Sequence, residues 1–167
     1  MYEKQERYEV NLIPNKGYEV HGQWKDDIHD IRTRIVFDYL SYEVLEAEAE
    51  AVAAPFTICP QGLKTIKELI GVRAGSGYIR TIREKIMSPE GCIHVGELAE
   101  YSLTAALNCA AREVPAGIDP KDYDQRWAFW QNAYNNCCIY FSQPDVLDKF
   151  QDDIKKVFNG SKKEKQF

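Results

Sequence analysis

A cysteine and a histidine two residues apart are the side chains in this sequence best suited to chemistry. Cys92 and His94 lie in the segment GCIHVGE, residues 91–97, where the pattern predicts the start of a helix. A thiol there meets the positive end of the helix dipole and free backbone N–H groups, which lower its pKa and favour the thiolate. Side chains at i and i+2 of a regular helix point about 200° apart, so the pair converges only if Cys92 caps the helix. The alternative is that Cys92 is a small buried residue and His94 a partly exposed one.

A metal site is a second kind of chemistry that the cysteines allow. The chain has five cysteines and three histidines, but it contains no Cys-x-x-Cys pair and no His-x-x-x-His pair. A closed zinc-finger module is therefore not indicated. Ligands would have to converge from distant positions, namely Cys59, Cys92, His94 and one of Cys137 or Cys138. The acidic segment 26–30 could add a carboxylate, although such a segment is more often a solvated turn.

A glycine pair before another predicted helix is a weaker candidate for cofactor binding. Gly75 and Gly77 match the first two glycines of a nucleotide-binding loop, but Arg80 stands at the position of the third. No parallel βαβ unit and no lysine–hydroxyl pair surrounds them, so these glycines are more typical of a turn. Arg80 and Arg83 could still clamp an anionic cofactor beside the helix start.

The elements that must position these residues are strands first and helices afterwards. Apolar and polar residues alternate over 8–12, 18–24, 31–37 and 42–51, which predicts four antiparallel strands joined by hairpins. The Glu/Ala run in the last of these has high helix propensity, but its strict period of two favours a strand with one acidic face.

After Pro55 the apolar period becomes that of helices. We expect helices from Pro60 to Gly71, from Ser76 to before Pro89, from Gly91 to about Arg112, in the first half of 122–141, and after Pro144 to Phe158. The expected fold is therefore α+β, with an N-terminal antiparallel β-meander packed against four or five C-terminal helices.

Composition narrows the remaining classes of function. The 167 residues are enough for one domain, expected over 1–158, with a polar, Lys-rich tail over 159–167. The net charge of −5 is opposite in sign to the basic footprint of a nucleic-acid binder, so we expect no nucleic-acid partner. No apolar run reaches the ~18 residues of a membrane helix, and no signal peptide precedes the domain, which favours a cytoplasmic location. An aromatic cluster over 127–141 is typical of a core or of a homodimer interface.

Several segments together carry a family resemblance. They are Thr57-Ile58-Cys59-Pro60, Leu69 to Tyr78 (LIGVRAGSGY), Ile82-Arg83-Glu84, the box from Gly91 to Leu98 (GCIHVGEL), and Asn135-Asn136-Cys137. Residues from about 18 to 145 resemble DUF2889, a bacterial family of proteins of unknown function, whose box has Thr and Leu where this chain has Ile93 and Val95. The resemblance implies no particular activity. It implies that Cys59, Cys92, His94 and Glu97 stand at motif positions of the family.

The order of elements is also similar to that of U-type iron–sulfur scaffolds and zinc-bound sulfur-acceptor proteins. Those proteins use Asp, Cys and sometimes His side chains at one end of a sheet. The likeness implies a site formed by Asp27, Cys59, Cys92 and either Cys137 or His94. A likeness at the level of the fold does not by itself establish a function.

Three hypotheses follow. The leading one is a site for zinc or an iron–sulfur species, with Cys59, Cys92 and His94 as ligands and Glu97 orienting His94. The second is an enzyme in which His94 and the helix terminus activate Cys92 as a nucleophile towards an acyl or small aromatic substrate. The third is a small-ligand binding or assembly module in which the cysteines only pack.

Overall fold

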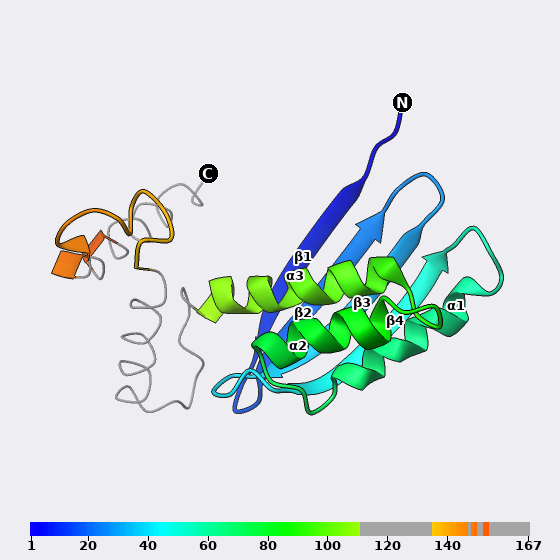
Figure 1. Ribbon diagram of the computed structural model, residues 1–167, viewed down its shortest axis with the longest axis horizontal. Helices are drawn as coiled ribbons and strands as arrows, with labels where there is room; N and C mark the ends of the chain where they lie inside the picture. The colour runs from blue at the N-terminus through cyan, green and yellow to red at the C-terminus, as the bar shows by residue number, and fades with distance from the viewer. Residues whose placement is uncertain (111–134, 147, 150–151, 154–167) are drawn as a thin grey trace. The chain divides into compact units, whose positions relative to one another are not determined.

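The computed structural model describes residues 1–110, 135–146, 148–149 and 152–153. The chain divides into two compact units, Met1–Ile118 and Asp119–Phe167, and each is described by itself. In the first unit, an antiparallel sheet carries helical segments on one face (Figure 1). The predicted α+β class is therefore confirmed. A single domain over residues 1–158 stays a prediction, and the tail 159–167 lies outside the described residues.

The sheet is a meander whose strands neighbour one another in chain order. The strands are β1 (Gln5–Ile13), β2 (Gly17–Lys25), β3 (Asp30–Asp38) and β4 (Val44–Ala53). Each pairs antiparallel with the next, as the alternation of apolar and polar residues predicts. In this sheet, β1 and β4 are the two edge strands.

In β4, pairing with β3 overrides local propensity. The Glu/Ala run is a strand, which confirms the prediction from its period of two. Ala47 pairs with Ile35 and is buried, whereas Glu48 pairs with Arg34 on the opposite face. The backbone ladder and the opposition of acidic to basic side chains outweigh the helix propensity of the run.

Three helical segments of the described chain cover one face of the sheet (Figure 1). They are α1 (Cys59–Gly62) continued by 3₁₀ turns over Leu63–Leu69, α2 (Ser76–Thr81) continued by a π-helical turn over Ile82–Ile86, and α3 (Ile93–Ala110). They begin within two residues of the positions that the sequence predicts. None of the helices in the described part of the chain has both the length and the apolar character needed to span a bilayer.

The expected count of four or five helices is not supported. After the sheet, the described residues of the first unit hold the three helical segments named above. The helix expected in the first half of 122–141 lies outside them, and much of the one expected over 144–158 does too. Residues 146, 148–149 and 152–153, which are described, are helical, in keeping with the helix expected after Pro144. Asp145, with a left-handed φ of 63°, lies directly before them.

The core of the first unit lies between the sheet and the helices. Its largest fully buried side chains include Tyr18, Ile35, Phe37, Tyr78 and Leu98. The Tyr78 hydroxyl donates a hydrogen bond to the Ala99 carbonyl oxygen at 2.7 Å, which ties α2 to α3. Burial raises the pKa of Tyr78, so the hydroxyl keeps its proton and remains a donor.

Candidate functional site

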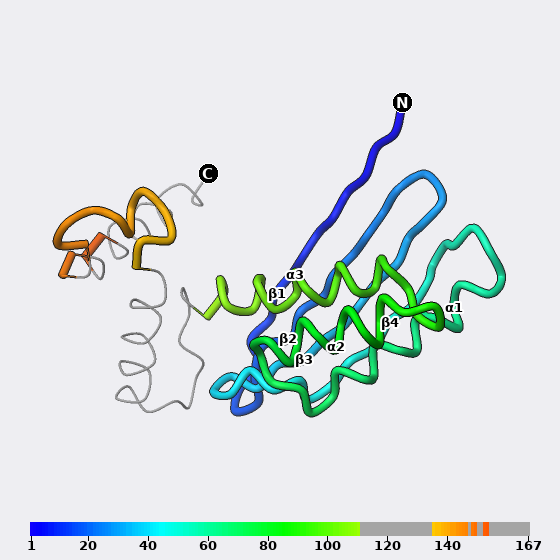
Figure 2. Tube along the Cα trace, viewed as in Figure 1, coloured from blue at the N-terminus to red at the C-terminus, as the bar shows by residue number. Residues whose placement is uncertain are grey.

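Several element ends lie together at one end of the sheet. Figure 2 shows the start of β1, the β2–β3 turn, the end of β4 and the start of α3 towards this end. Trp24, Asp26, His29, Cys92 and His94 belong to these ends or to the segments leading into them. The polar side chains of separate elements can therefore meet there without crossing the core.

Cys92 caps α3. The Gly96 N–H donates a hydrogen bond to the Cys92 carbonyl at 3.1 Å, and the Cys92 N–H donates to the Ile86 carbonyl at 2.8 Å. Gly91 allows this close approach, because an added Cβ would lie 1.9 Å from the Ile86 carbonyl oxygen. Cys92 thus precedes the regular helix, which is the condition under which its side chain can converge with that of His94.

The structure brings the Cys92 and His94 side chains together. The Cys92 Sγ lies 3.8 Å from the His94 Nδ1, within hydrogen-bonding distance for sulfur. Both residues are half-buried. The thiol therefore has an imidazole nitrogen as its neighbour at the start of an 18-residue helix.

The His94 ring lies between two other rings. Its centroid is 4.6 Å from that of Trp24 and 4.3 Å from that of His29. Burial lowers the pKa of His94, and the charges of His29 and Lys4 lower it further, although Asp26 acts in the opposite direction. The imidazole is therefore neutral at pH 7 and able to accept a proton.

Asp26 and His29 form a second pair behind His94. The Asp26 side chain is only 5% exposed and accepts hydrogen bonds from the His29 Nδ1 at 3.0 Å and from the Trp24 Nε1 at 3.2 Å. It also accepts from the Ile28 and His29 backbone N–H groups. Burial alone would raise the pKa of Asp26, but these hydrogen bonds outweigh it and hold the pKa well below its usual range.

Sequence reasoning treated this acidic segment as a source of one carboxylate and gave His29 no role. The residue that it named, Asp27, is exposed, and its neighbour Asp26 contacts the histidine. An Asp whose carboxylate accepts hydrogen bonds from the backbone N–H groups two and three residues later forms a recognisable turn motif. That motif identifies Asp26 as a turn residue, but nothing in the sequence places the turn beside α3.

Glu97 lies one helical turn beyond His94. Its Oε2 is buried and has no hydrogen-bond partner among the described residues. The role predicted for Glu97, orienting His94, stays a prediction, because the contact recorded at the His94 Nδ1 comes from the Cys92 thiol.

The other predicted metal ligands belong to separate parts of the chain. Cys59 is half-buried at the start of α1, whose Gly62 packs closely against the Gly91 backbone. Cys137 is exposed and belongs to the second unit. No group of three or more His, Cys, Asp or Glu side chains among the described residues is placed to hold a metal ion.

The two arginines predicted to bind an anionic cofactor are both exposed. Arg80 lies in α2 and Arg83 in the π-helical turn that continues it. Since α2 has only six residues, its N-terminus provides little dipole for an anion. Cofactor binding by these arginines stays a prediction.

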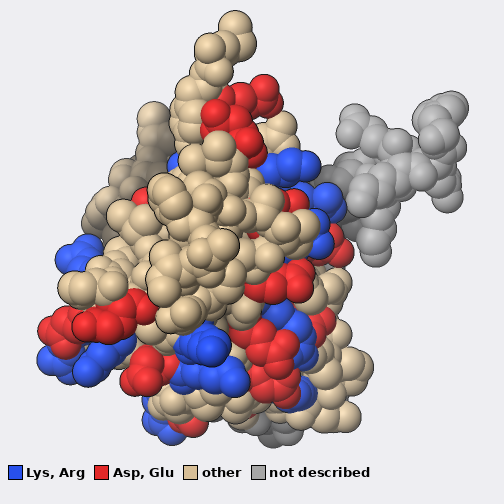
Figure 3. All heavy atoms as spheres, turned by 90° about the vertical axis from the view of Figure 1, so that its right-hand side faces the viewer, with Lys and Arg blue, Asp and Glu red and all other residues tan. Residues whose placement is uncertain are grey.

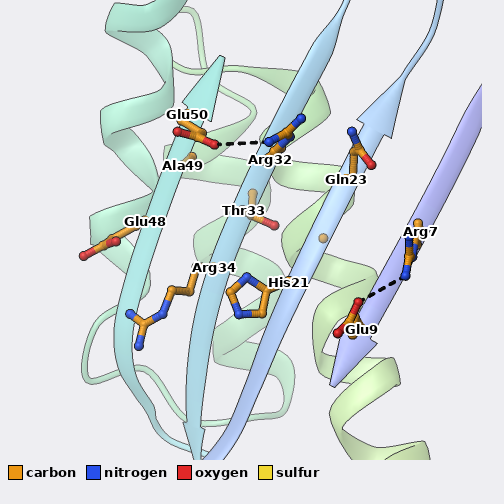
Figure 4. Close-up of a pocket in the computed structure, with 11 residues that line it drawn as sticks. Arg7, Glu9, His21, Gln23, Arg32, Thr33, Arg34, Glu48, Ala49 and Glu50 are labelled. Atoms are coloured by element: carbon orange, nitrogen blue, oxygen red, sulfur yellow. Dashed lines mark hydrogen bonds and ion pairs between the residues drawn. The ribbon is translucent and has the colours of Figure 1, made fainter. Parts of the chain in front are cut away.

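A hollow of about 540 Å³ lies on the face of the sheet opposite the helices (Figure 4). Charged side chains of all four strands line it, including Arg7, Glu9, His21, Arg32, Arg34, Glu48 and Glu50. Several of these charges are paired within the surface, for example Arg7 with Glu9 at 3.2 Å and Arg32 with Glu50 at 3.9 Å. The hollow thus resembles a solvated, ion-paired sheet face more than a catalytic site.

Comparison with known proteins identifies the family. The family model described as "Protein of unknown function (DUF2889)" matches residues 6–108, which run from β1 almost to the end of α3. The chain belongs to the DUF2889 family. The DUF2889 match includes Cys59, Cys92, His94 and Glu97, and it also includes Asp26 and His29, which the structure adds to the site. Searches of the curated proteins and of the solved structures find no match to this chain.

Proposed function

We propose that this DUF2889 domain is a thiol-dependent enzyme that uses Cys92 as its nucleophile towards an acyl substrate. The observation that carries the proposal is the 3.8 Å separation of the Cys92 Sγ and the His94 Nδ1 at the cap of α3. A nucleophile within reach of a base, with a further group behind the base, is the arrangement of covalent catalysis.

The first chemical step would be transfer of the thiol proton to His94. Its lowered pKa keeps the imidazole neutral and ready to accept that proton. The Cys92 sulfur then bonds to the acyl carbon, and the electron pair of the carbonyl moves to its oxygen. Collapse of this intermediate expels the leaving group, which takes the proton from His94.

Backbone N–H groups at the start of α3 would stabilise the negative charge in these steps. The first N–H groups of a helix have no partner within it, and the helix dipole is positive at this end. The Gly96 N–H is occupied by the Cys92 carbonyl, which leaves those of residues 93–95 for a thiolate or an oxyanion.

Asp26 and His29 would act through His94. The Asp26 carboxylate fixes the tautomer of His29 by accepting from its Nδ1, and the His29 ring packs against that of His94. The negative charge of Asp26 also favours the protonated form of His94 once His94 has taken the thiol proton. We therefore assign Asp26 and His29 as positioning residues.

Metal binding by Cys59, Cys92 and His94 is the second candidate function. Two imidazoles and a thiol are close together, and such ligands suit zinc and iron–sulfur species. The described residues provide no three-ligand group, so we derive no step through a metal. Less than about a tenth of an equivalent of transition metal in anaerobically purified, reconstituted protein would eliminate this candidate.

Alkylation rates test the enzyme proposal. We expect iodoacetamide to modify Cys92 at least about tenfold faster than Cys59 or Cys109 near neutral pH, because the thiolate is the reactive form. Peptide mass spectrometry at successive times measures each rate. His94→Gln should slow Cys92 alone, whereas His21→Gln, on the opposite sheet face, should change nothing.

Equal and slow alkylation of all the cysteines would contradict the proposal. If Cys92→Ser then lowered the stability of the domain without any loss of partner binding, the assembly module would be the better description. In an assembly module the cysteines only pack, and neither metal binding nor catalysis is involved.

The remaining proposals about partners rest on charge and composition. We propose that the domain acts without nucleic acid, in the cytoplasm, and as a homodimer. Figure 3 shows basic and acidic side chains interspersed on the face that it presents. The net charge of −5 is in keeping with that pattern. The aromatic residues considered for the dimer interface lie in large part outside the described residues.

A further inference from the structure

The ammonium group of Lys4 has two partners of different kinds close to Cys92 and His94. Its Nζ lies 4.0 Å from the centroid of the Trp24 ring and 2.6 Å from the Glu6 Oε1. An ammonium over an indole face is a cation–π contact, and Trp provides the strongest face for one. One cation is thus held by an aromatic ring and by a carboxylate.

Glu97 and Tyr8 also act on the pair of Lys4 and Glu6. The hydrogen bond from Lys4 to Glu6 raises the pKa of the lysine, and the charge of Glu97 raises it further. The buried Oε2 of Glu97 has no partner in the described part of the chain. Tyr8 donates from its hydroxyl to the other oxygen of Glu6 at 3.1 Å and so fixes that carboxylate.

We propose that Trp24 and Glu6 form a binding site for a primary ammonium group of a ligand, that the charge of Glu97 supports this site, and that Lys4 occupies it in the free protein. An indole face and a carboxylate that already pairs with a cation together suit a cation with several N–H donors.

The position of the ammonium site bears on the substrate. Trp24 contacts Lys4 with its ring and lies 4.6 Å, centroid to centroid, from the His94 ring. A ligand whose amine replaces that of Lys4 would therefore extend towards His94 and Cys92. If Cys92 is the nucleophile proposed above, the substrate is an acyl compound that also carries a primary amine.

Lys4 is suited to being displaced. It precedes β1, so the sheet ladder does not fix it, and its side chain is 39% exposed. Because the Lys4 amine is tethered to the protein, it competes with a free amine as if it were present at a high local concentration. Removing the lysine side chain should therefore make the site more available to an added amine.

An NMR titration of the full chain tests the ammonium site. The probe is Nα-acetyl-lysine methylamide, and the readout is the Trp24 indole N–H signal, assigned through Trp24→Phe. We expect a saturable shift, and about tenfold tighter binding to Lys4→Ala if the site is free about a tenth of the time in the wild type. Lys16→Ala, whose lysine pairs with Glu46 on the opposite face, is the matched control and should bind as the wild type does.

Two further arms give the test its specificity. The norleucine analogue of the probe, which lacks the amine, should cause no saturable shift. Glu97→Gln should weaken binding at least about fivefold, because it removes one charge from the site. No saturable shift with the lysine probe, equal affinities of the wild type and Lys4→Ala, or binding of the norleucine analogue would overturn the ammonium site.

The outcome can be separated from that of the enzyme proposal. The same titration is repeated with Cys92→Ala, which lacks the nucleophile but keeps every residue of the ammonium site. Saturable binding to this variant, with uniform alkylation of the wild-type cysteines, would support the ammonium site and reject the thiol enzyme. Preferential alkylation of Cys92 without amine binding would do the reverse.

Discussion

The behaviour of the site depends on one imidazole that is kept neutral. His94 contacts the rings of Trp24 and His29, and it faces the charges of Lys4 and Asp26. Burial and the cationic neighbours disfavour its protonated form, and Asp26 compensates only in part. A neutral imidazole can act as a base near neutral pH, whereas a fully solvated histidine would be partly protonated there.

The same environment makes stability depend on pH. The unfolded pKa of His94 is about 6.5, and its folded pKa is lower. As the pH falls, the folded state therefore takes up fewer protons than the unfolded state does. The contribution of His94 is fully present above the unfolded pKa and is lost as the pH falls through the folded pKa. We expect the wild type to lose more stability than His94→Gln between about pH 7.5 and about pH 5.5.

Urea unfolding at the two pH values measures this difference. His21→Gln serves as the control, since His21 is 48% exposed on the opposite face of the sheet. Identical losses of stability in the wild type and in His94→Gln would show that the environment of His94 does not disfavour its protonated form relative to water.

At the scale of elements, the position of Cys92 depends on tight contacts between backbones. Gly91 lies against the Ile86 carbonyl where the second helical segment ends, and Gly62 of α1 lies against Gly91. The segment leading into α3 is therefore fixed by two other helical segments. A change at Gly91 should move the thiol as well as lower the stability.

Gly91→Ala tests this dependence. The added Cβ would lie 1.9 Å from a backbone oxygen that cannot rotate away, so we expect a loss of about 3 kcal/mol or more in the free energy of unfolding. Gly77→Ala is the matched control, because a Cβ there meets no atom within 4 Å and Gly77 lies inside α2. It should stabilise the domain by about 0.5–1 kcal/mol. Equal effects in chemical denaturation would contradict the role of Gly91.

These elements also mark what the sequence could predict. The period of two predicted all four strands, including the Glu/Ala strand β4. The sequence left open whether Cys92 caps its helix, and the structure places it at the cap. Asp26 and His29 were not recognised as partners of His94, because a turn and a helix start 65 residues apart in sequence meet only after folding. The contact of Lys4, which precedes β1, with the Trp24 ring also forms only after folding, and no local sequence pattern predicts it.

At the scale of the whole first unit, the sheet has two different faces. One face is apolar and covered by helices, and the other carries ion pairs around the hollow of Figure 4. Arg34 is central to the second face, with its Nε 2.5 Å from Glu19 and its Nη1 2.7 Å from Glu46. Ion pairs of this kind compensate the charges of the open face.

Salt dependence distinguishes the two faces. Arg34→Gln should cost about 0.2–1 kcal/mol of stability at low ionic strength, because its ion pairs are partly exposed. At 1 M salt, where the Debye length is about 3 Å, most of that difference should disappear. The more exposed Arg7→Gln should cost less than Arg34→Gln. Thermal unfolding at both ionic strengths measures the effect, and a cost that salt leaves unchanged would mean that Arg34 acts by packing.

The long reach of the site along the chain has a consequence for folding. The meander needs only contacts between successive strands and is complete by Ala53, whereas the site requires Trp24 and His29 to meet His94. Contacts of such high sequence separation carry a large loop-closure cost and form late. A nascent chain would therefore carry a finished sheet until α3 docks, with Cys92 and His94 still apart from Trp24 and His29. If Cys92 is the nucleophile proposed above, its base would reach its final environment only in the completed domain.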